Sequence, residues 1–338
     1  MASSAHRMES QTSGLRTTLP REVADDGVVN IGLRGAVLAV RNNEPVVLTR
    51  PRSDGRAADE LPSGPYLPLT HDSLDAGMRF WVHAQTGLAL SSTEQLAAFG
   101  DPQGEDDERR TVSVGYLSLV RADAHINPQA AHWRSWYEFL PWEDWRNGRP
   151  ELIDMALLPR LQAWAAQRPR LDEKSAILRR EERIGICFGL DGAAWDDEKV
   201  VDRYELLREA GIVGEAARRF PAGADVGPVG RIMSPGHRRV VAMAIGRLRS
   251  RLKHRPVVFD LLPETFTLYE LQKVVESILG PHLHKQNFRR LVESMGLVEP
   301  TGDIRARTGG RPAKLYRFRR DVLLERAAPG VRVKLGRP

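Results

Sequence analysis

Two closely spaced helices constrain this chain most, because one stretch of its C-terminal third specifies where each of them begins and ends. Thr267 and Glu270 have the spacing of a capping box, which predicts a helix over Leu268–Leu279. Gly280 and the proline after it predict the end of that helix, since glycine accepts the left-handed conformation of a C-terminal cap. A short turn then leads into a second helix over Lys285–Met295. The stretch therefore predicts a helix–turn–helix.

The second of these helices is amphipathic. Its apolar residues recur with the spacing i, i+3, i+4 and i+7, which defines one buried face: Phe288, Leu291, Val292 and Met295. The opposite face carries an amide and two guanidinium groups, on Gln286, Arg289 and Arg290. Such side chains bind base edges and phosphates in the major groove of DNA. An ordinary amphipathic helix with a solvated polar face has the same stripe, so the stripe alone leaves both interpretations open.

A basic β-hairpin is expected after the second helix. Its strands are predicted over Leu297–Glu299 and Ala313–Phe318, and the loop over 300–310 is rich in arginine and ends in two glycines. A helix–turn–helix followed by a basic hairpin is the winged-helix arrangement, in which a loop arginine suits a narrow minor groove. A hairpin with an exposed basic turn and no ligand is the alternative. The side chains predicted to contact DNA are Lys285, Gln286, Asn287, Arg289, Arg290, Arg305, Arg307, Arg311 and Lys314.

The charge of the chain divides at about residue 231. The net charge is +6, but residues 231–338 contain 23 Lys and Arg against 9 Asp and Glu, a balance of +14, which leaves −8 for the rest. A basic block beside an acidic one indicates that one module binds a polyanion; a solvated basic surface is the alternative. Ser234 and Pro235 have the pattern of an N-cap and a first-turn proline, and they predict a helix running to about His254.

We expect five regions along the chain: a disordered leader over 1–27, an α/β domain over 28–168, a helical connector and hinge over 169–230, the basic winged-helix domain over 231–325 and a loose tail over 326–338. The α/β domain is predicted from strand-like segments over 31–40, 45–49 and 111–120 and from a helical pattern over 74–86. Six aromatic rings between Trp133 and Trp145 are open to three interpretations: a ligand pocket, a corner of the core, or a dimer contact.

Composition excludes some classes of protein. No apolar run approaches the ~20 residues that a membrane-spanning helix needs, and the N-terminal stretch lacks the hydrophobic segment of a secretory signal. The single cysteine, Cys187, cannot form an intramolecular disulfide and fits a reducing cytoplasm. Because Cys187 lies in an apolar run, we expect a buried structural thiol and not a nucleophile.

Several short motifs occur together in the two halves of the chain: Thr111–Leu117, Trp136–Trp142, Phe188–Trp195, Arg255–Phe259, Phe266–Gln272, Asn287–Arg290 and Gly310–Ala313 followed by Tyr316. In this combination the chain resembles the Nudix-related transcriptional regulators of NAD metabolism (the NrtR-like regulators), and it looks closest to their alphaproteobacterial NadQ type. The resemblance implies an α/β Nudix-like sandwich domain, a helical connector and a C-terminal winged helix-turn-helix domain. It also implies a homodimer that represses NAD-biosynthesis genes under the control of adenine nucleotides.

A Nudix hydrolase binds Mg²⁺ through the glutamates of its Nudix box, and this chain lacks them. Aligning the box on Gly87 puts Asp72 at its first glutamate. The metal-binding pairs, however, are replaced by Phe80 and Trp81 at the Arg-Glu pair and by Ala84 and Gln85 at the Glu-Glu pair. Mg²⁺ requires hard oxygen ligands, preferably anionic ones, which these side chains do not supply. Without the metal, attack on a diphosphate loses its charge neutralisation. We therefore expect neither a metal site nor hydrolase activity.

The sequence thus predicts a cytoplasmic repressor that binds palindromic double-stranded operator DNA, with NAD and/or ATP as the effector and no membrane partner. A Nudix-type hydrolase of ADP-ribose or a related dinucleotide, with an accessory nucleic-acid-binding domain, is the main alternative. A nucleic-acid-binding protein without a small ligand is a third. The residues predicted to bind the effector are Arg50, Arg52, Trp81, Arg109 and Arg110.

Overall fold

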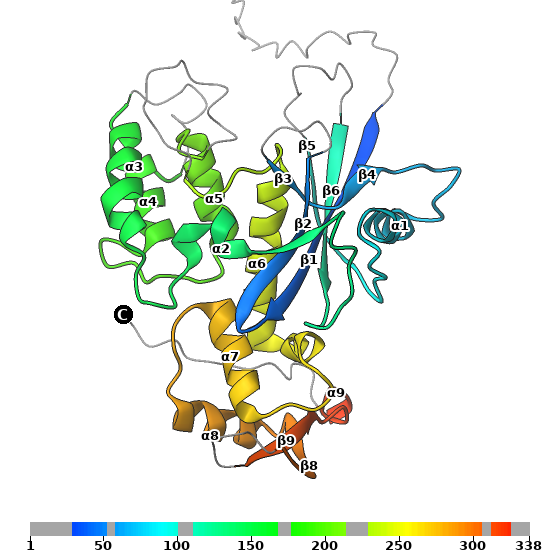
Figure 1. Cartoon of the computed structure of the whole chain (residues 1–338). Helices are drawn as coiled ribbons and strands as arrows, with labels where there is room; N and C mark the ends of the chain where they lie inside the picture. Colours follow the sequence, from blue (N-terminus) through cyan, green and yellow to red (C-terminus); the bar gives the residue numbers. More distant parts are fainter. Residues whose placement is uncertain are drawn as a thin grey trace, which may run out of the picture.

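The computed structural model describes residues 29–52, 58–100, 111–167, 177–213, 229–305 and 312–325. A twisted sheet flanked by helices forms the upper part of the molecule, and a smaller module of helices and a hairpin lies below it (Figure 1). The predicted leader over 1–27 and the tail over 326–338 lie outside the described residues.

The sheet is built around one long hairpin. β1 (Asn30–Arg41) pairs antiparallel with β2 (Glu44–Pro51) through a turn in which Asn42 and Asn43 both have positive φ, as a tight hairpin requires. The main strand order is β3-β2-β1-β6-β5, with β1 and β6 parallel, while β4 pairs with β1 and β7 with β2. The remaining strands are β3 (Asp59–Glu60), β4 (Ser63–Pro65), β5 (Glu94–Gly100), β6 (Thr111–Leu119) and β7 (His132–Ser135).

Helices cover both faces of the sheet. On one face, α1 (Leu74–Thr86) packs Met78 and Val82 against residues of β1, and it has the bounds that the sequence predicted. On the other face, α6 (His237–His254) contacts β1, β5 and β6, with Val240 close to Gly115.

The predicted start of α6 is wrong by two residues. Gly236, with φ +79°, is the N-cap residue in place of Ser234. The Ser234 hydroxyl instead donates a hydrogen bond to Glu60, 2.8 Å away on β3. A partner from a distant strand has therefore displaced the local capping interaction that the sequence suggested.

The aromatic segment forms a corner of the core. Trp136, Phe139 and Trp142 are fully buried in the helical layer beside the sheet, and Tyr137 and Trp145 are buried with them, whereas Trp133 on β7 is only partly buried and lies outside this cluster. The layer comprises α2 (Trp136–Phe139), η1 (Pro141–Glu143), η2 (Ile153–Leu157), α3 (Leu158–Ala165), α4 (Arg180–Phe188) and α5 (Val200–Glu209). Pro159 lies in the first turn of α3 and follows a π-helical turn, so the predicted interruption is present. Cys187 is buried, and burial raises the pKa of its thiol.

The lower module has the predicted helix–turn–helix and hairpin. Its elements are η5 (Val257–Leu261), α7 (Leu268–Leu279), α8 (Lys285–Met295), β8 (Val298–Arg305), β9 (Ala313–Phe318) and α9 (Val322–Glu325). The capping box at Thr267 forms as predicted, with the Glu270 carboxylate accepting from the Thr267 amide at 2.8 Å. The first strand is longer than expected: β8 continues to Arg305 because a bulge after Pro300 absorbs the residues expected to leave the sheet.

Candidate nucleic-acid interface

The α8 helix presents its polar face to solvent. Its apolar stripe faces inward as predicted, with Phe288 and Val292 buried and the other two members partly buried. The predicted base-reading and phosphate-contacting side chains of this helix are all exposed: Lys285, Gln286, Asn287, Arg289 and Arg290. The helix begins after His284 with no side-chain cap and no acidic residue in its first turn. The first backbone N–H groups of α8 are therefore compatible with a phosphate.

A buried carboxylate fixes the turn between α7 and α8. Glu276 is buried and accepts hydrogen bonds from Gln272 Nε2 at 2.7 Å, Lys273 Nζ at 2.7 Å and the Leu283 amide at 3.0 Å. Burial by itself raises the pKa of Glu276, but these donors outweigh it and lower the pKa below its ordinary value. The anion thus ties the turn to the helix that precedes α8. This role of Glu276 was not predicted from the sequence, although a glutamate within an apolar helix face is a detectable signal.

The hairpin, which is the wing of this module, is joined to the helices through its second strand. Phe266 and Tyr316 exchange two backbone hydrogen bonds of 2.9 and 2.8 Å, and Phe318 stacks on Phe259 with ring centroids 4.4 Å apart. Arg305, a predicted DNA contact, lies at the end of β8, where its guanidinium donates to Glu270 Oε1 at 2.6 Å. Two further predicted contacts, Arg307 and Arg311, lie outside the described residues, and Lys314 is exposed on β9.

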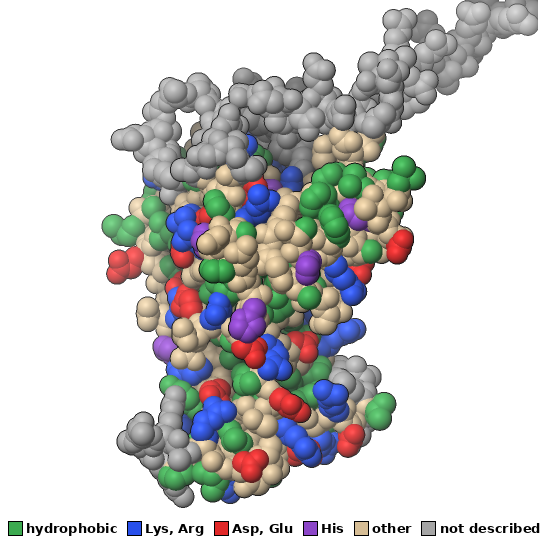
Figure 2. Space-filling model, turned by 45° about the vertical axis from the view of Figure 1, so that its right-hand side comes forward, with side chains coloured by type: hydrophobic (Ala, Val, Ile, Leu, Met, Phe, Trp, Pro, Cys, Tyr) green, Lys and Arg blue, Asp and Glu red, His purple; other side chains and the backbone are tan. Residues whose placement is uncertain are grey.

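Carboxylates accompany the basic side chains of this surface. Arg289 pairs with Glu293 at 2.9 Å, and Arg317, which the sequence analysis did not select, pairs with Glu299 at 2.6 Å. Figure 2 shows Lys and Arg interspersed with Asp and Glu over the lower, winged-helix part of the visible face. Exposed ion pairs of this kind contribute about 0–1 kcal/mol each, so their guanidinium groups can exchange a carboxylate for a phosphate at little cost.

The basic charge of α6 is directed away from this surface. Six of the eight basic residues over 231–255 contact acidic side chains of the sheet domain and helical layer: Arg231, Arg239, Arg247, Arg249, Arg251 and Lys253. A seventh, Arg238, is buried and donates to the Val229 and Arg231 carbonyls just before α6. Without this segment, residues 256–338 retain 15 basic and 9 acidic residues, a balance of +6. The predicted balance of +14 therefore overstates the charge available to a polyanion. The expected domain boundary at 231 stays a prediction, but α6 packs chiefly on the sheet and α5.

Two predicted effector residues lie where the end of β2 meets the start of α6. Arg52 is 3.9 Å from Glu60, and Arg50 pairs with the same residue in the strand register. His237 lies beneath them, fully buried, and its Nδ1 accepts a hydrogen bond from the Leu61 amide at 2.9 Å. Burial first, and then the positive charges of Arg34, Arg52 and Arg50, hold the pKa of His237 well below its ordinary value. His237 is therefore neutral near pH 7.

The same cluster continues around Asp59, a nearly buried carboxylate of β3. Asp59 accepts a hydrogen bond from Arg231 and lies 3.4 Å from Arg134. The structure thus brings five arginines from four segments to one end of the sheet, and only two of them, Arg50 and Arg52, were predicted from the sequence. Of the other predicted effector residues, Arg109 and Arg110 lie outside the described residues, and Trp81 lies on α1, on the face of the sheet opposite α6.

The residues at the Nudix-box positions of α1 do not fit a magnesium site. Trp81 Nε1 donates to the Pro65 carbonyl at 2.8 Å, and the Gln85 amide is bonded to the Ser63 backbone at 3.0 and 2.8 Å. Phe80 is 46% exposed, and its ring lies tilted against that of His71 with the centroids 5.2 Å apart. Within the described ranges, no three Asp, Glu, His or Cys residues are grouped closely enough to hold a metal ion.

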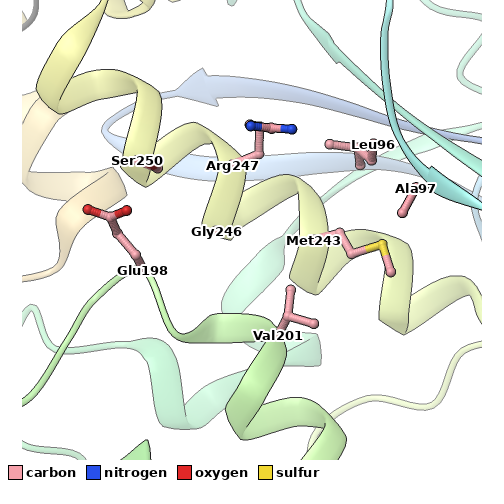
Figure 3. A pocket seen from close by; sticks show the side chains of 8 residues that line it. All are labelled: Leu96, Ala97, Glu198, Val201, Met243, Gly246, Arg247 and Ser250. Atoms are coloured by element: carbon pink, nitrogen blue, oxygen red, sulfur yellow. The ribbon is translucent and has the colours of Figure 1, made fainter.

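The groove in Figure 3 lies between β5, α5 and α6 and has a volume of about 320 Å³. Glu198, Val201, Met243 and Arg247 are among its lining residues, and of the predicted effector residues that the structure describes, Arg50, Arg52 and Trp81, none lines it. Among the helices that the structure describes, none is long and apolar enough to cross a membrane.

The chain combines a Nudix-like α/β domain with a C-terminal winged helix, a fold similar to that of a solved NrtR structure. Residues 258–318 match the family described as the NrtR DNA-binding winged helix domain. A protein of Acinetobacter baylyi named ADPR responsive transcriptional repressor NtrR is 40% identical over 82 residues, which are 24% of this chain and 32% of that protein. The match thus spans about a third of that relative's length.

Two solved structures are similar over most of the chain. The first is Shewanella oneidensis NrtR complexed with a 27mer DNA, with a TM-score of 0.50 and 19% identity over 86% of this chain and 94% of that one. The second is a MutT/nudix family protein from Enterococcus faecalis, with a TM-score of 0.48 and 16% identity over 88% and 90% of the two chains. At this identity, the first likeness shows the shared fold.

Proposed function

We propose that this protein is a DNA-binding transcriptional repressor whose Nudix-like domain binds an adenine nucleotide. The exposed polar face of α8 carries the proposal, because a buried apolar stripe and the Glu276 turn hold it rigidly outward. Arginine and glutamine on such a face can form the paired hydrogen bonds that distinguish bases in the major groove. The match of residues 258–318 to a DNA-binding winged-helix family and the name of the Acinetobacter baylyi relative support this role.

For the effector, we propose that phosphate oxygens bind the arginine cluster at the end of β2. Guanidinium groups outnumber carboxylates there, and planar guanidinium groups match phosphate geometry well. The five members are Arg34, Arg50, Arg52, Arg134 and Arg231, around Asp59 and Glu60. ADP-ribose is the first ligand to test, because the Acinetobacter baylyi repressor is named as ADPR responsive. NAD and ATP, the effectors suggested by the sequence, are the next.

The remaining proposals follow from this role. Winged-helix repressors that act as homodimers bind palindromic operators, because the two recognition helices are related by the two-fold axis of the dimer. From the resemblance to the NrtR-like regulators we infer a homodimer in the cytoplasm, and from the homodimer a palindromic operator. The resemblance to the NadQ type adds NAD-biosynthesis genes as the proposed targets. No hydrolysis is included in the proposal, since α1 offers Mg²⁺ no carboxylate at the Nudix-box positions.

The DNA-binding proposal is tested by selecting duplexes from a random library and measuring their affinity by fluorescence anisotropy. Arg290→Ala is expected to weaken binding by about 1–3 kcal/mol if Arg290 contacts a base bidentately. Arg179→Ala is the matched control, because Arg179, the N-cap residue before α4, is 80% exposed and its loss removes the same charge. Equal affinities for the two variants would contradict the assignment of α8 as the recognition helix.

The effector proposal is tested by titrating the intact protein with ADP-ribose, NAD and ATP in a calorimeter. Arg52→Ala is expected to weaken binding of the nucleotide that the wild type accepts. Arg79→Ala on α1 is the control, since Arg79 is exposed and pairs only with its neighbour Asp75 among the ion pairs of the described residues. Nucleotide binding that is unchanged by Arg52→Ala would place the effector elsewhere.

A further inference from the structure

Side chains of α2 and α6 cap the C-terminal end of α7. In a continuing helix, the Ser277 carbonyl would accept a hydrogen bond from residue 281, but Pro281 has no N–H. The Tyr137 hydroxyl supplies that hydrogen bond at 2.8 Å. Arg249 Nε on α6 donates to the next carbonyl, that of Ile278, at 2.9 Å. A guanidinium at the negative end of a helix dipole is a favourable arrangement, and here it joins the two modules.

The Arg249 guanidinium is held at the same time by a buried carboxylate. Its Nη1 lies 2.5 Å from Glu143 Oε2 on η1 and 3.1 Å from the Asp197 carbonyl. A second guanidinium, that of Arg203 on α5, is bonded to both oxygens of Glu143 at 2.6 and 3.0 Å. All three side chains are 0–1% exposed. One anion and two cations are thus enclosed where η1, α5, α6 and α7 meet.

Close packing accompanies these bonds. Gly280 ends α7 against Trp145, and a Cβ atom added to Gly280 would lie 2.9 Å from the Trp145 Cβ. Trp145 in turn lies against Trp195, over which the Arg203 guanidinium is stacked at 3.8 Å. A buried charge that loses one partner is strongly destabilised, so this joint cannot loosen one bond at a time. It is therefore suited to two discrete arrangements and not to gradual sliding.

The α6 helix connects this joint to the proposed effector site. Its first residue, His237, bonds to the Leu61 amide beside the arginine cluster, and Ser234 just before the helix bonds to Glu60. Arg249 lies twelve residues further along α6, which corresponds to about 18 Å of continuous helix. One rigid element therefore touches the effector cluster at one end and the end of α7 at the other (Figure 1).

We propose that the Glu143–Arg203–Arg249 cluster is the joint that locks the winged helix to the Nudix-like domain and passes the state of the effector site to α8. The second half of this proposal rests on the proposed function, whereas the first half is a mechanical property of the chain. In this scheme Arg249 acts as a positioning residue: it orients α7, and through the Glu276 turn α8, without touching DNA or nucleotide.

The mechanical half is tested by differential scanning calorimetry of the full chain. The wild type is expected to unfold its two modules in one transition, and Arg249→Met to separate a winged-helix transition from the rest. Arg247→Met is the control, because Arg247 lies on the same helix, is 48% exposed and pairs with Glu94. Tyr137→Phe, which removes only the hydroxyl bonded to Ser277, is a milder second variant that keeps the core filled. Tyr137→Phe is expected to broaden the single transition or to split it into two, as Arg249→Met does, but to a smaller extent.

The signalling half is tested by operator affinity with and without ADP-ribose. Arg249→Met, or Tyr137→Phe if the former does not fold, is expected to reduce the effect of ADP-ribose on operator affinity at least fivefold while changing the affinity of the ligand-free protein less than threefold. Arg247→Met is expected to respond like the wild type. A single wild-type-like transition in both junction variants would overturn the mechanical proposal. An unreduced ADP-ribose response would overturn the signalling proposal. A wild type that does not respond to ADP-ribose refutes the proposed function and, with it, the signalling half, and calorimetry still decides the mechanical half.

Discussion

Replacing Glu143 by glutamine tests the energetics of the buried cluster most directly. The substitution keeps the size of the side chain and one carbonyl oxygen, but it removes the only carboxylate in contact with Arg203 and Arg249 among the described residues. Removing one partner of a buried ion pair costs about 3–5 kcal/mol, because it leaves the other charge uncompensated. Backbone carbonyls of Cys187, Asp196 and Asp197 still contact the two guanidinium groups, so we expect the lower end of this range, about 3 kcal/mol.

Thermal unfolding followed by circular dichroism measures this loss of stability. At roughly 2–4 °C per kcal/mol for a domain of this size, Glu143→Gln should lower the midpoint by about 6–12 °C. Glu44→Gln is the matched control: Glu44 also pairs with an arginine, Arg146, but it is 37% exposed, so solvent screening holds its effect below about 1 kcal/mol. A Glu143→Gln loss no larger than that of the control would refute the reasoning that the cluster is a dry, mutually dependent set of charges.

The pH dependence of the same variant follows from the pKa of Glu143. Burial by itself raises this pKa, but Arg203 and then Arg249 outweigh it, so the pKa in the folded protein is below the ordinary value of 4.5. A carboxyl group whose pKa is lower in the folded than in the unfolded protein stabilises the fold. This stabilisation is fully present at pH values above the pKa of the unfolded state and is lost as the pH falls through the pKa of the folded state. The stability difference between wild type and Glu143→Gln should therefore be constant from pH 6 to 7 and shrink below about pH 4.5. A difference that grew on acidification would contradict the sign of the shift.

Three other outcomes concern the proposed interface and the sheet domain. Glu293→Gln should raise DNA affinity about two- to fivefold, because it frees Arg289 and removes a carboxylate near phosphate, while it changes stability by less than about 0.5 kcal/mol; weaker binding in anisotropy titrations would contradict this. Operator affinity should fall by about 10³-fold or more between 50 and 200 mM salt if six or more phosphates are neutralised, and a flat salt profile would argue against the winged-helix surface. ADP-ribose incubated with the protein and Mg²⁺ should yield no AMP by chromatography, and turnover would restore the hydrolase alternative.

The sequence determined the elements whose ends are specified locally. The bounds of α1, α7 and α8 agree with the prediction because an N-cap, a C-terminal glycine or an apolar stripe marks each of them within a few residues. The winged helix and the outward face of α8 followed from the same signals. The absence of carboxylates at the Arg-Glu and Glu-Glu pairs of the Nudix box also needed only the sequence, since metal chemistry depends on which atoms the side chains carry.

Only the tertiary structure decided what the charges of α6 do. Sequence composition counted Arg249 in the basic block that indicated a polyanion-binding module, whereas in the fold it is fully buried with Glu143, 106 residues away in the chain. The arginine cluster at the end of β2 similarly combines segments that only strand pairing and the docking of α6 bring together. Local patterns fix helices because their interactions span three or four residues. Burial and charge pairing depend on contacts between distant segments, and these are set when the α6 helix packs on the sheet and the winged helix packs on both.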